Sequence, residues 1–324
     1  MDYADICGQT TVKRAMETAA AGRHSCLLIG PAGTGKTMAA RRLPSILPPI
    51  TLEESIEVSK VYSICGLLPK DLPLITERPF RAPHHSITAQ SLAGGGRNPR
   101  PGEISLASGG VLFLDELTEF PGRILDLLRQ PLEEKRITVT RLSGILEFPA
   151  DCMLICAMNP CLCGKFPSEK CTCSESQIRR YLGRVSGPFL DRIDIEWKFR
   201  SCGELRGTAR AGEKRSEESS AAMRKRVEKA RNMQEKRFAG LSIRCNSEMG
   251  PAEIREFCSL LPEDEAFLMA VYRQYGFSAR GFDKILKVAR TVADLDGADQ
   301  IGRIHLCEAV SYRSFEKKYW GAKK

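Results

Sequence analysis

Apolar residues follow two different spacings along the first 200 positions, and these spacings predict alternating helices and strands. Apolar side chains in segment 8–23 recur at helical spacing up to Gly22, where a helix end is expected. A second helical pattern runs from Lys36 to Leu43. Short apolar runs with the length of buried strands lie at 26–30, 109–116, 152–160 and 193–199. This alternation predicts an α/β fold around a parallel sheet.

Two segments interrupt the alternation. Residues 51–102 begin as a helix and end in a Pro/Gly-rich stretch, and they are long for a connection, so we expect a functional insertion. Residues 136–149 contain two β-rich runs around Leu142, Ser143 and Gly144, which predicts a β-hairpin. A short helix over 123–129 should precede this hairpin.

The pattern changes after residue 200. From residue 216 onward the apolar positions follow helical spacing only, and the polar stretch 201–215 separates the two patterns. We therefore expect an α/β nucleotide-binding domain over 1–200, a linker over 201–215 and an all-helical lid domain over 216–324.

Composition narrows the class of protein. No apolar run reaches the roughly 18 residues of a membrane helix, and the start of the chain lacks the pattern of a signal peptide, so we expect a cytoplasmic protein that contacts no membrane. The net charge of +9 mildly favours an anionic partner. Much of this charge lies in residues 200–237, where a solvated charged helix is an equally good explanation.

The segment GPAGTGKT matches the phosphate-binding loop pattern G-x-x-x-x-G-K-[ST] in full and lies between a predicted strand and a predicted helix. Its backbone N–H groups are expected to surround the phosphates of ATP or GTP, and Lys36 to reach the β- and γ-phosphates. The Thr37 hydroxyl is expected to ligate Mg²⁺. The residues predicted to bind nucleotide are Gly30, Pro31, Ala32, Gly33, Thr34, Gly35, Lys36 and Thr37.

An acidic pair ends the second predicted strand. Asp115 and Glu116 follow VLFL, at the edge where open parallel sheets bind ligands. Asp115 is predicted to hold Mg²⁺ through water, and Glu116 to act as the general base that polarises the attacking water. The sequence therefore favours hydrolysis over binding alone.

Three further polar residues are candidates for the same chemistry. Asn159 ends the third strand, where an amide can hold the attacking water or, as the alternative, cap the strand end. Arg192 precedes the fourth strand, and Arg280 begins a helix of the second domain. Each arginine has a surface ion pair as its alternative role, for Arg192 with Asp191 or Asp194.

Most of the thirteen cysteines are scattered singly in apolar context, and reduced thiols are the expectation for them. Cys161, Cys163, Cys171 and Cys173 differ, because they form two Cys-x-Cys pairs. Four thiolates suit tetrahedral Zn²⁺ in a closed structural site, although this spacing is tighter than the usual Cys-x-x-Cys. Metal-free thiols, disulfides and an iron–sulfur cluster remain the alternatives.

Six segments are spread over nearly the whole chain: GPAGTGKT, RPFRAPHHSIT, PGEISLASGGVLFLDELTEF, AMNPC, GPFLDRID and SARGFDKILKVARTVADL. In their order and spacing they resemble the magnesium-chelatase-type AAA+ ATPases. The resemblance is strongest to the ComM (YifB) family. By this resemblance Asn159 is sensor 1, Arg192 is an arginine finger that acts on a neighbouring subunit, and Arg280 is sensor 2, which contacts the γ-phosphate from the lid. Residues 136–149 would be the pre-sensor-1 hairpin, and 51–102 would contain the helix-2 insertion.

The resemblance also implies a ring, usually a homohexamer, that binds ATP between subunits and acts as a DNA-remodelling motor on single-stranded or branched DNA. In such rings the insertion and the hairpin face the central channel. Arg78, Arg81, His84, His85, Arg97, Arg100 and Arg141 are then the candidate contacts to DNA phosphates, with a structural role for His84 and His85 as the alternative.

Two other functions stay open. One is a magnesium-chelatase motor subunit that remodels a partner protein, and the other is a scaffold that binds nucleotide without hydrolysing it. Family members usually carry a Lon-protease-like domain before the ATPase, whereas this sequence starts almost directly with the ATPase part. We therefore expect either an excised ATPase portion or a naturally short relative.

Overall fold

The computed structural model describes residues 1–69, 71–141, 144–199, 217–313 and 319–320. A five-stranded sheet in the order β2-β5-β8-β1-β9 crosses its centre, and every pairing in it is parallel. The strands are β1 (Cys26–Ile29), β2 (Phe80–Arg81), β5 (Val111–Leu114), β8 (Met153–Met158) and β9 (Ile195–Lys198). The predicted parallel α/β sheet is thus confirmed.

One strand of this sheet was not predicted. β2 lies inside the expected insertion, where Phe80 pairs with Val111 at the edge of the sheet. Only two residues pair, and prolines at 79 and 83 bound them, so the segment has no strand-like pattern of its own. Its pairing with β5 makes it a strand, and this pairing is not visible in the local sequence.

Both faces of the sheet are covered, which explains why its interior strands are apolar at every position. Cys26 and Leu28 face a core shared with α1 (Thr10–Gly22), α2 (Lys36–Arg42) and the C-terminal helices. Leu27 and Ile29 point to the other face. That face is covered by α5 (Glu103–Leu106), α6 (Gly122–Leu127), α8 (Glu175–Leu182) and α9 (Gly187–Leu190).

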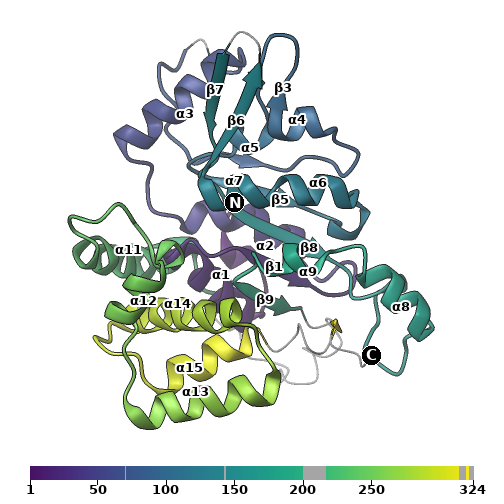
Figure 1. Ribbon diagram of the computed structural model, residues 1–324, viewed down its shortest axis with the longest axis vertical. Helices are drawn as coiled ribbons and strands as arrows, with labels where there is room; N and C mark the ends of the chain where they lie inside the picture. Colours follow the sequence, from purple (N-terminus) through teal and green to yellow (C-terminus); the bar gives the residue numbers. More distant parts are fainter. Residues whose placement is uncertain (70, 142–143, 200–216, 314–318, 321–324) are drawn as a thin grey trace.

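The remaining elements of residues 51–102 precede and follow β2 along the chain. They are α3 (Leu52–Ile64), α4 (Ala89–Ala93) and the small antiparallel pair β3 (Gly94–Gly95) and β4 (Arg100–Pro101). They lie at the end of the molecule opposite the C-terminal helices, together with the hairpin (Figure 1). The insertion and the hairpin are therefore neighbours in space.

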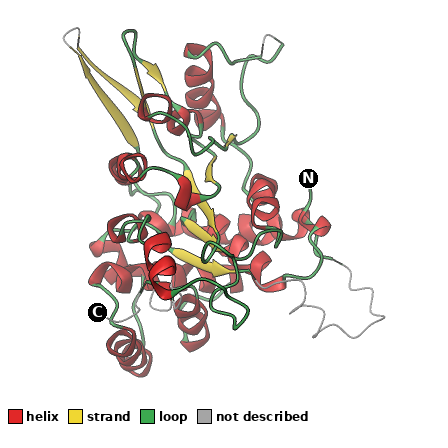
Figure 2. Cartoon of the chain, turned by 90° about the vertical axis from the view of Figure 1, so that its right-hand side faces the viewer, coloured by secondary structure: helices red, strands yellow, loops and turns green. Residues whose placement is uncertain are grey.

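The predicted hairpin consists of β6 (Arg136–Arg141) and β7 (Gly144–Pro149), with Ile137 opposite Phe148. Figure 2 shows the two strands projecting from the body of the molecule. The predicted turn residues Leu142 and Ser143 lie outside the described residues. The short helix expected before the hairpin is two helices, α6 and α7 (Arg129–Glu134).

The C-terminal region is helical, as predicted, and the expected linker 201–215 lies outside the described residues. Its helices are α11 (Ser220–Arg237), α12 (Pro251–Phe257), α13 (Pro262–Tyr275), α14 (Ala279–Asp296) and α15 (Arg303–Ser311). Buried polar contacts join this region to the sheet domain, since His24 Nε2 lies 2.8 Å from Thr291 Oγ1. Across the described residues, no helix combines the length and the apolar character needed to span a membrane.

Candidate functional site

The glycine-rich loop connects β1 to α2, as the sequence predicts. Gly33 and Gly35 have φ angles of 75° and 94°, a left-handed conformation that side chains rarely adopt. The helix begins directly afterwards, at Lys36. The unpaired N–H groups of the first turn of α2 therefore lie next to the loop, an arrangement that favours phosphate binding.

Lys36 is buried beneath this loop. Its ammonium donates hydrogen bonds to Gly30 O (2.7 Å), Pro31 O (2.8 Å) and Asn159 Oδ1 (3.2 Å). Burial lowers the pKa of Lys36, and the Asp115 carboxylate opposes this shift. The amide predicted to hold the attacking water thus meets the lysine predicted to reach the phosphates.

Thr37 and Asp115 also meet at this edge of the sheet. The Thr37 hydroxyl donates to Asp115 Oδ2 at 2.7 Å, and the Glu116 N–H donates to Asp115 Oδ1 at 2.9 Å. A hydroxyl and a carboxylate oxygen in contact are hard ligands of the kind that Mg²⁺ prefers. The Glu116 side chain is 66% exposed, so water can reach its carboxylate.

One contact at this edge was not foreseen. His85 Nδ1 lies 3.5 Å from Glu116 Oε2, which puts this histidine at the predicted general base. Its ring is T-shaped against Phe120 and tilted against His84. The sequence offered the two histidines of RAPHHS as candidate DNA contacts. The contact between His85 and Glu116 becomes visible only in the fold, where β2 pairs with β5.

Arg192 and Arg280 lie at the opposite edge of the sheet. Both line a pocket of about 560 Å³ together with Ser25 and Asp194, which immediately precede β1 and β9. Because the strands are parallel, residues before them lie at the amino edge, whereas the phosphate loop follows β1 at the carboxyl edge. The structure therefore does not bring Arg280 to the phosphate loop of its own chain.

Arg192 forms an ion pair with Glu133 and donates to Pro188 O at 3.0 Å. The predicted alternative partner Asp194 is instead paired with Lys284 Nζ at 2.9 Å. The Arg192 side chain is 11% exposed, and its present partner is a half-exposed glutamate. Glu133 could not be foreseen as this partner, because the two residues are close only in the fold.

Two of the seven candidate DNA contacts are structural residues. Arg78 donates to Pro48 O and Gly109 O, each at 2.6 Å, and pairs with Glu54. Arg81 binds both oxygens of Glu103, at 2.6 and 2.7 Å. These contacts fix both guanidinium groups in the fold and occupy N–H donors that another ligand would need.

The other candidates differ in their surroundings. His84 Nδ1 contacts Ser86 Oγ at 2.8 Å, and His85 contacts Glu116. Arg97 and Arg100 are exposed at the β3–β4 pair, where a ligand could reach them. The backbone of Arg141 ends β6, and its side chain lies outside the described part of the structure.

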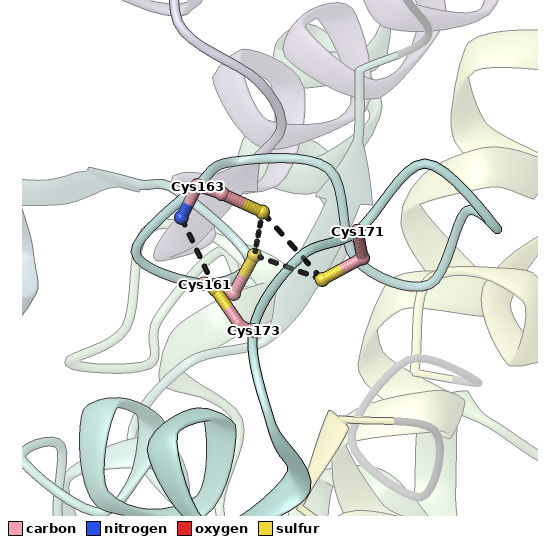
Figure 3. Close-up of side chains that lie close together, drawn as sticks. All are labelled: Cys161, Cys163, Cys171 and Cys173. Carbon is pink, nitrogen blue, oxygen red and sulfur yellow. Dashed lines mark hydrogen bonds between the residues drawn. The ribbon is translucent and has the colours of Figure 1, made fainter.

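The four clustered cysteines converge within one loop (Figure 3). Cys161 Sγ lies 3.4 Å from Cys163 Sγ and 3.7 Å from Cys171 Sγ, and Cys163 and Cys171 are 3.5 Å apart. All four sulfur atoms, that of Cys173 included, lie within 4.8 Å of one another. With Zn–S bonds of about 2.3 Å, the sulfur atoms of a tetrahedral site lie roughly 3.8 Å apart, so the cluster fits this metal.

The distances between the sulfur atoms also bear on the disulfide and metal-free alternatives to a zinc site. A disulfide requires about 2.05 Å between sulfur atoms, and the four thiols are free in this structure. Backbone N–H groups, that of Thr172 foremost, lower the pKa of Cys163 to about 5. Thiolates are the form that binds metal, and this form is favoured at Cys163, whereas the pKa values of Cys161, Cys171 and Cys173 are raised, for Cys161 chiefly by burial.

A parallel sheet that brings Lys36, Thr37 and Asp115 to one edge, followed by a helical region, defines a nucleotide-binding protein of the P-loop class. Residues 2–205 match the family described as magnesium chelatase, subunit ChlI, and residues 217–313 match the ChlI C-terminal family. The chain therefore belongs to the magnesium-chelatase family, as its motifs predicted.

Individual relatives agree with this assignment. The competence protein ComM of Haemophilus influenzae is 46% identical over 97% of the chain, and YifB of Escherichia coli is 44% identical over 98%. The chain spans about 60% of the length of these relatives. A magnesium-chelatase 67 kDa subunit of Heliobacterium mobile is 29% identical over 49% of the chain, and the matching region is 28% of that subunit.

Proposed function

We propose that the protein hydrolyses ATP with the residues that meet at the carboxyl edge of its sheet. The observation that carries this proposal is the convergence of Lys36 with Asn159 and of Thr37 with Asp115. Loop N–H groups and Lys36 would bind the phosphates, and Thr37 and Asp115 would hold Mg²⁺, which neutralises phosphate charge when bound. Glu116 would accept a proton from the attacking water, which Asn159 orients.

Binding and turnover of ATP test this assignment separately. Lys36→Ala should abolish both, whereas Glu116→Gln should keep nucleotide binding and lose hydrolysis by about a hundredfold or more. Glu175→Gln, at a carboxylate that is 88% exposed, is the matched control and should behave as wild type. Wild-type hydrolysis by Glu116→Gln would refute the role of Glu116, and a wild-type chain that binds no nucleotide would refute the site.

We infer further that Arg192 and Arg280 both act on the nucleotide of a neighbouring subunit in a homohexameric ring. They share one pocket at the amino edge, away from the phosphate loop of their own chain. A mixture of Lys36→Ala and Arg192→Ala chains should therefore recover turnover that neither variant shows alone. In a mixed ring, an intact Lys36 from an Arg192→Ala chain can face an intact Arg192 from a Lys36→Ala chain. Additive, unrecovered activity would contradict action between subunits.

DNA is the substrate that we propose for this motor, single-stranded or branched. The insertion presents Arg97 and Arg100 to solvent beside a projecting hairpin, and one relative is named a competence protein. ATPase rates with and without forked DNA are the test, with binding measured at moderate salt. Neither binding nor stimulation would contradict this substrate.

The alternative is a motor that remodels a protein partner, as a magnesium-chelatase subunit would. The family match and the similarity to a magnesium-chelatase subunit favour it. An ATPase that DNA leaves unchanged, with no DNA binding, would support this alternative over the DNA motor.

We also propose that Cys161, Cys163, Cys171 and Cys173 hold one structural Zn²⁺. Their mutual distances fit a closed tetrahedral shell, which leaves no position for catalysis. Metal analysis of untagged protein should find about one zinc per chain. Protein that folds and contains no stoichiometric zinc would refute the site.

A further inference from the structure

The cysteine loop begins at the nucleotide site. β8 ends at Met158, whose carbonyl accepts a hydrogen bond from the N–H of Gly30 at 3.2 Å. The next residue, Asn159, contacts Lys36, and Cys161, which follows two positions later, is fully buried. The first metal ligand is thus anchored in the core directly behind the phosphate loop.

The loop then returns to the phosphate loop at Gly164. A Cβ atom added at Gly164 would lie 3.8 Å from Pro31 Cα and 3.9 Å from Ala32 N. The backbone at Gly164 therefore lies beside the first residues of the phosphate loop, at a separation that a single methyl group would fill. Its φ of 74° is the left-handed conformation in which glycine is favoured.

Sulfur atoms hold the two ends of this loop together. Between residues 161–163 and 171–173, all of which the structure describes, the hydrogen-bonded contacts involve cysteine sulfur, such as Cys163 N–H to Cys173 Sγ at 3.4 Å. The backbone hydrogen bonds inside the loop are short-range turns, from Gly164 to Cys161, from Ser168 to Lys165 and from Cys171 to Ser168. Four metal–sulfur bonds would supply the cross-link that these turns lack, since structural zinc contributes directly to folding.

We propose that the metal held by the four cysteines sets the affinity of the protein for nucleotide, because it fixes the cysteine loop beside Pro31 and Ala32 of the phosphate loop. This inference rests on the proposed nucleotide and zinc sites. Loss of the metal frees the loop to leave the phosphate loop, whose backbone N–H groups then lose their fixed orientation. Preorganised groups bind more tightly than mobile ones, so affinity falls. The cluster is then a control point for ATP binding that is separate from the catalytic residues.

The test measures zinc content and the dissociation constant of a fluorescent ADP analogue in parallel. Cys163→Ser/Cys171→Ser should lose zinc and bind the nucleotide about tenfold more weakly, a difference of roughly 1.4 kcal/mol. Cys7→Ser/Cys307→Ser, at two exposed cysteines outside the cluster, is the matched control and should keep both zinc and affinity. Wild-type protein stripped by a chelator should lose affinity and regain it with added zinc.

A second variant covers the case in which loss of two cysteines unfolds the chain. Gly164→Asn keeps all four thiolates, suits the left-handed backbone better than a branched residue and places a side chain between the two loops, so it should retain zinc and still bind nucleotide more weakly. Wild-type affinity in zinc-free protein, or in zinc-loaded Gly164→Asn, would overturn the coupling. A wild-type chain that binds zinc but no nucleotide would instead overturn the nucleotide site, and one without zinc would overturn the metal site.

Discussion

His85 contacts Glu116 across the edge of the sheet, with 3.5 Å between Nδ1 and Oε2. The register of β2 and β5 produces this contact, because Phe80 lies opposite Val111 and Arg81 opposite Leu112. Continued past the strands, the same register brings His85 level with the predicted general base. A residue that the sequence offered as a DNA contact therefore lies at the edge where we propose that ATP is hydrolysed.

We expect His85→Ala to lower the ATP turnover number about tenfold, less than loss of the general base itself, because the carboxylate loses the group that orients it. Nucleotide affinity should not change. His85→Gln should recover part of the rate, since an amide can still donate to Glu116. Steady-state kinetics separate the two parameters, and His84→Ala is the control in the same segment. An equal loss in both alanine variants would contradict a specific role for His85.

Arg192→Ala should lower turnover by roughly a thousandfold while nucleotide binding stays intact, the pattern of an arginine finger. Its present partner, Glu133, is half-exposed, so the loss of this ion pair should cost little stability. Arg123→Ala, at an exposed arginine of α6, is the matched control for kinetics and binding. Turnover unaffected by Arg192→Ala would remove this residue from the mechanism.

Asp194→Asn should lower the free energy of unfolding by about 3 kcal/mol at pH 7, because it breaks a largely buried ion pair and leaves Lys284 without its carboxylate. Burial raises the pKa of Asp194, but Lys284 and His24 outweigh this and hold it well below 3.8. The stabilisation is therefore complete above the unfolded-state pKa and is lost progressively as the pH falls from about 4 toward the much lower pKa of the folded state. Denaturant unfolding from pH 7 to pH 3 should show a constant difference between the two proteins down to about pH 5 and a narrowing difference below it.

A constant difference over that range would show that the carboxylate charge is not the cause. Asp126→Asn is the control, since this exposed carboxylate lies 3.9 Å from Arg129 and should contribute little.

Arg78→Ala should change the stability of the fold, whereas Arg97→Ala/Arg100→Ala should change DNA binding. Loss of Arg78 leaves Pro48 O and Gly109 O without their donor and should destabilise the fold by about 2 kcal/mol. The double variant should leave stability within about 0.5 kcal/mol of wild type. It should weaken DNA binding and reduce the salt dependence by about one ion per phosphate contact. Thermal unfolding and binding at several salt concentrations distinguish the two outcomes.

Local sequence patterns predicted most helices and strands but not which strands pair in the sheet. The four apolar strands and the C-terminal helices are recognisable because burial on both faces, or on one helical face, leaves a pattern in the residues themselves. β2 escaped prediction because two residues between prolines carry no such pattern. Its place depends on β5, far along the chain.

The candidate site shows the same division. Thr37 and Asp115 meet as predicted, because α2 and its loop follow the carboxyl end of β1, Asp115 follows the carboxyl end of β5, and such ends share an edge. Arg280 does not join them, since its position depends on how the helical region packs against the sheet. Nor could the sequence show that Arg78 is fixed by backbone carbonyls, because these belong to remote segments.

The separation of Lys36 and Arg192 on opposite edges of one sheet has a genetic consequence in the proposed ring. Each polypeptide then contributes to two ATP sites, its own through Lys36 and a neighbour's through Arg192, so a copy that lacks Arg192 keeps its own phosphate loop and impairs the adjacent site. A cell that makes both intact and Arg192-deficient chains would assemble mostly mixed rings. Such alleles should behave as dominant, whereas alleles that prevent folding should be recessive.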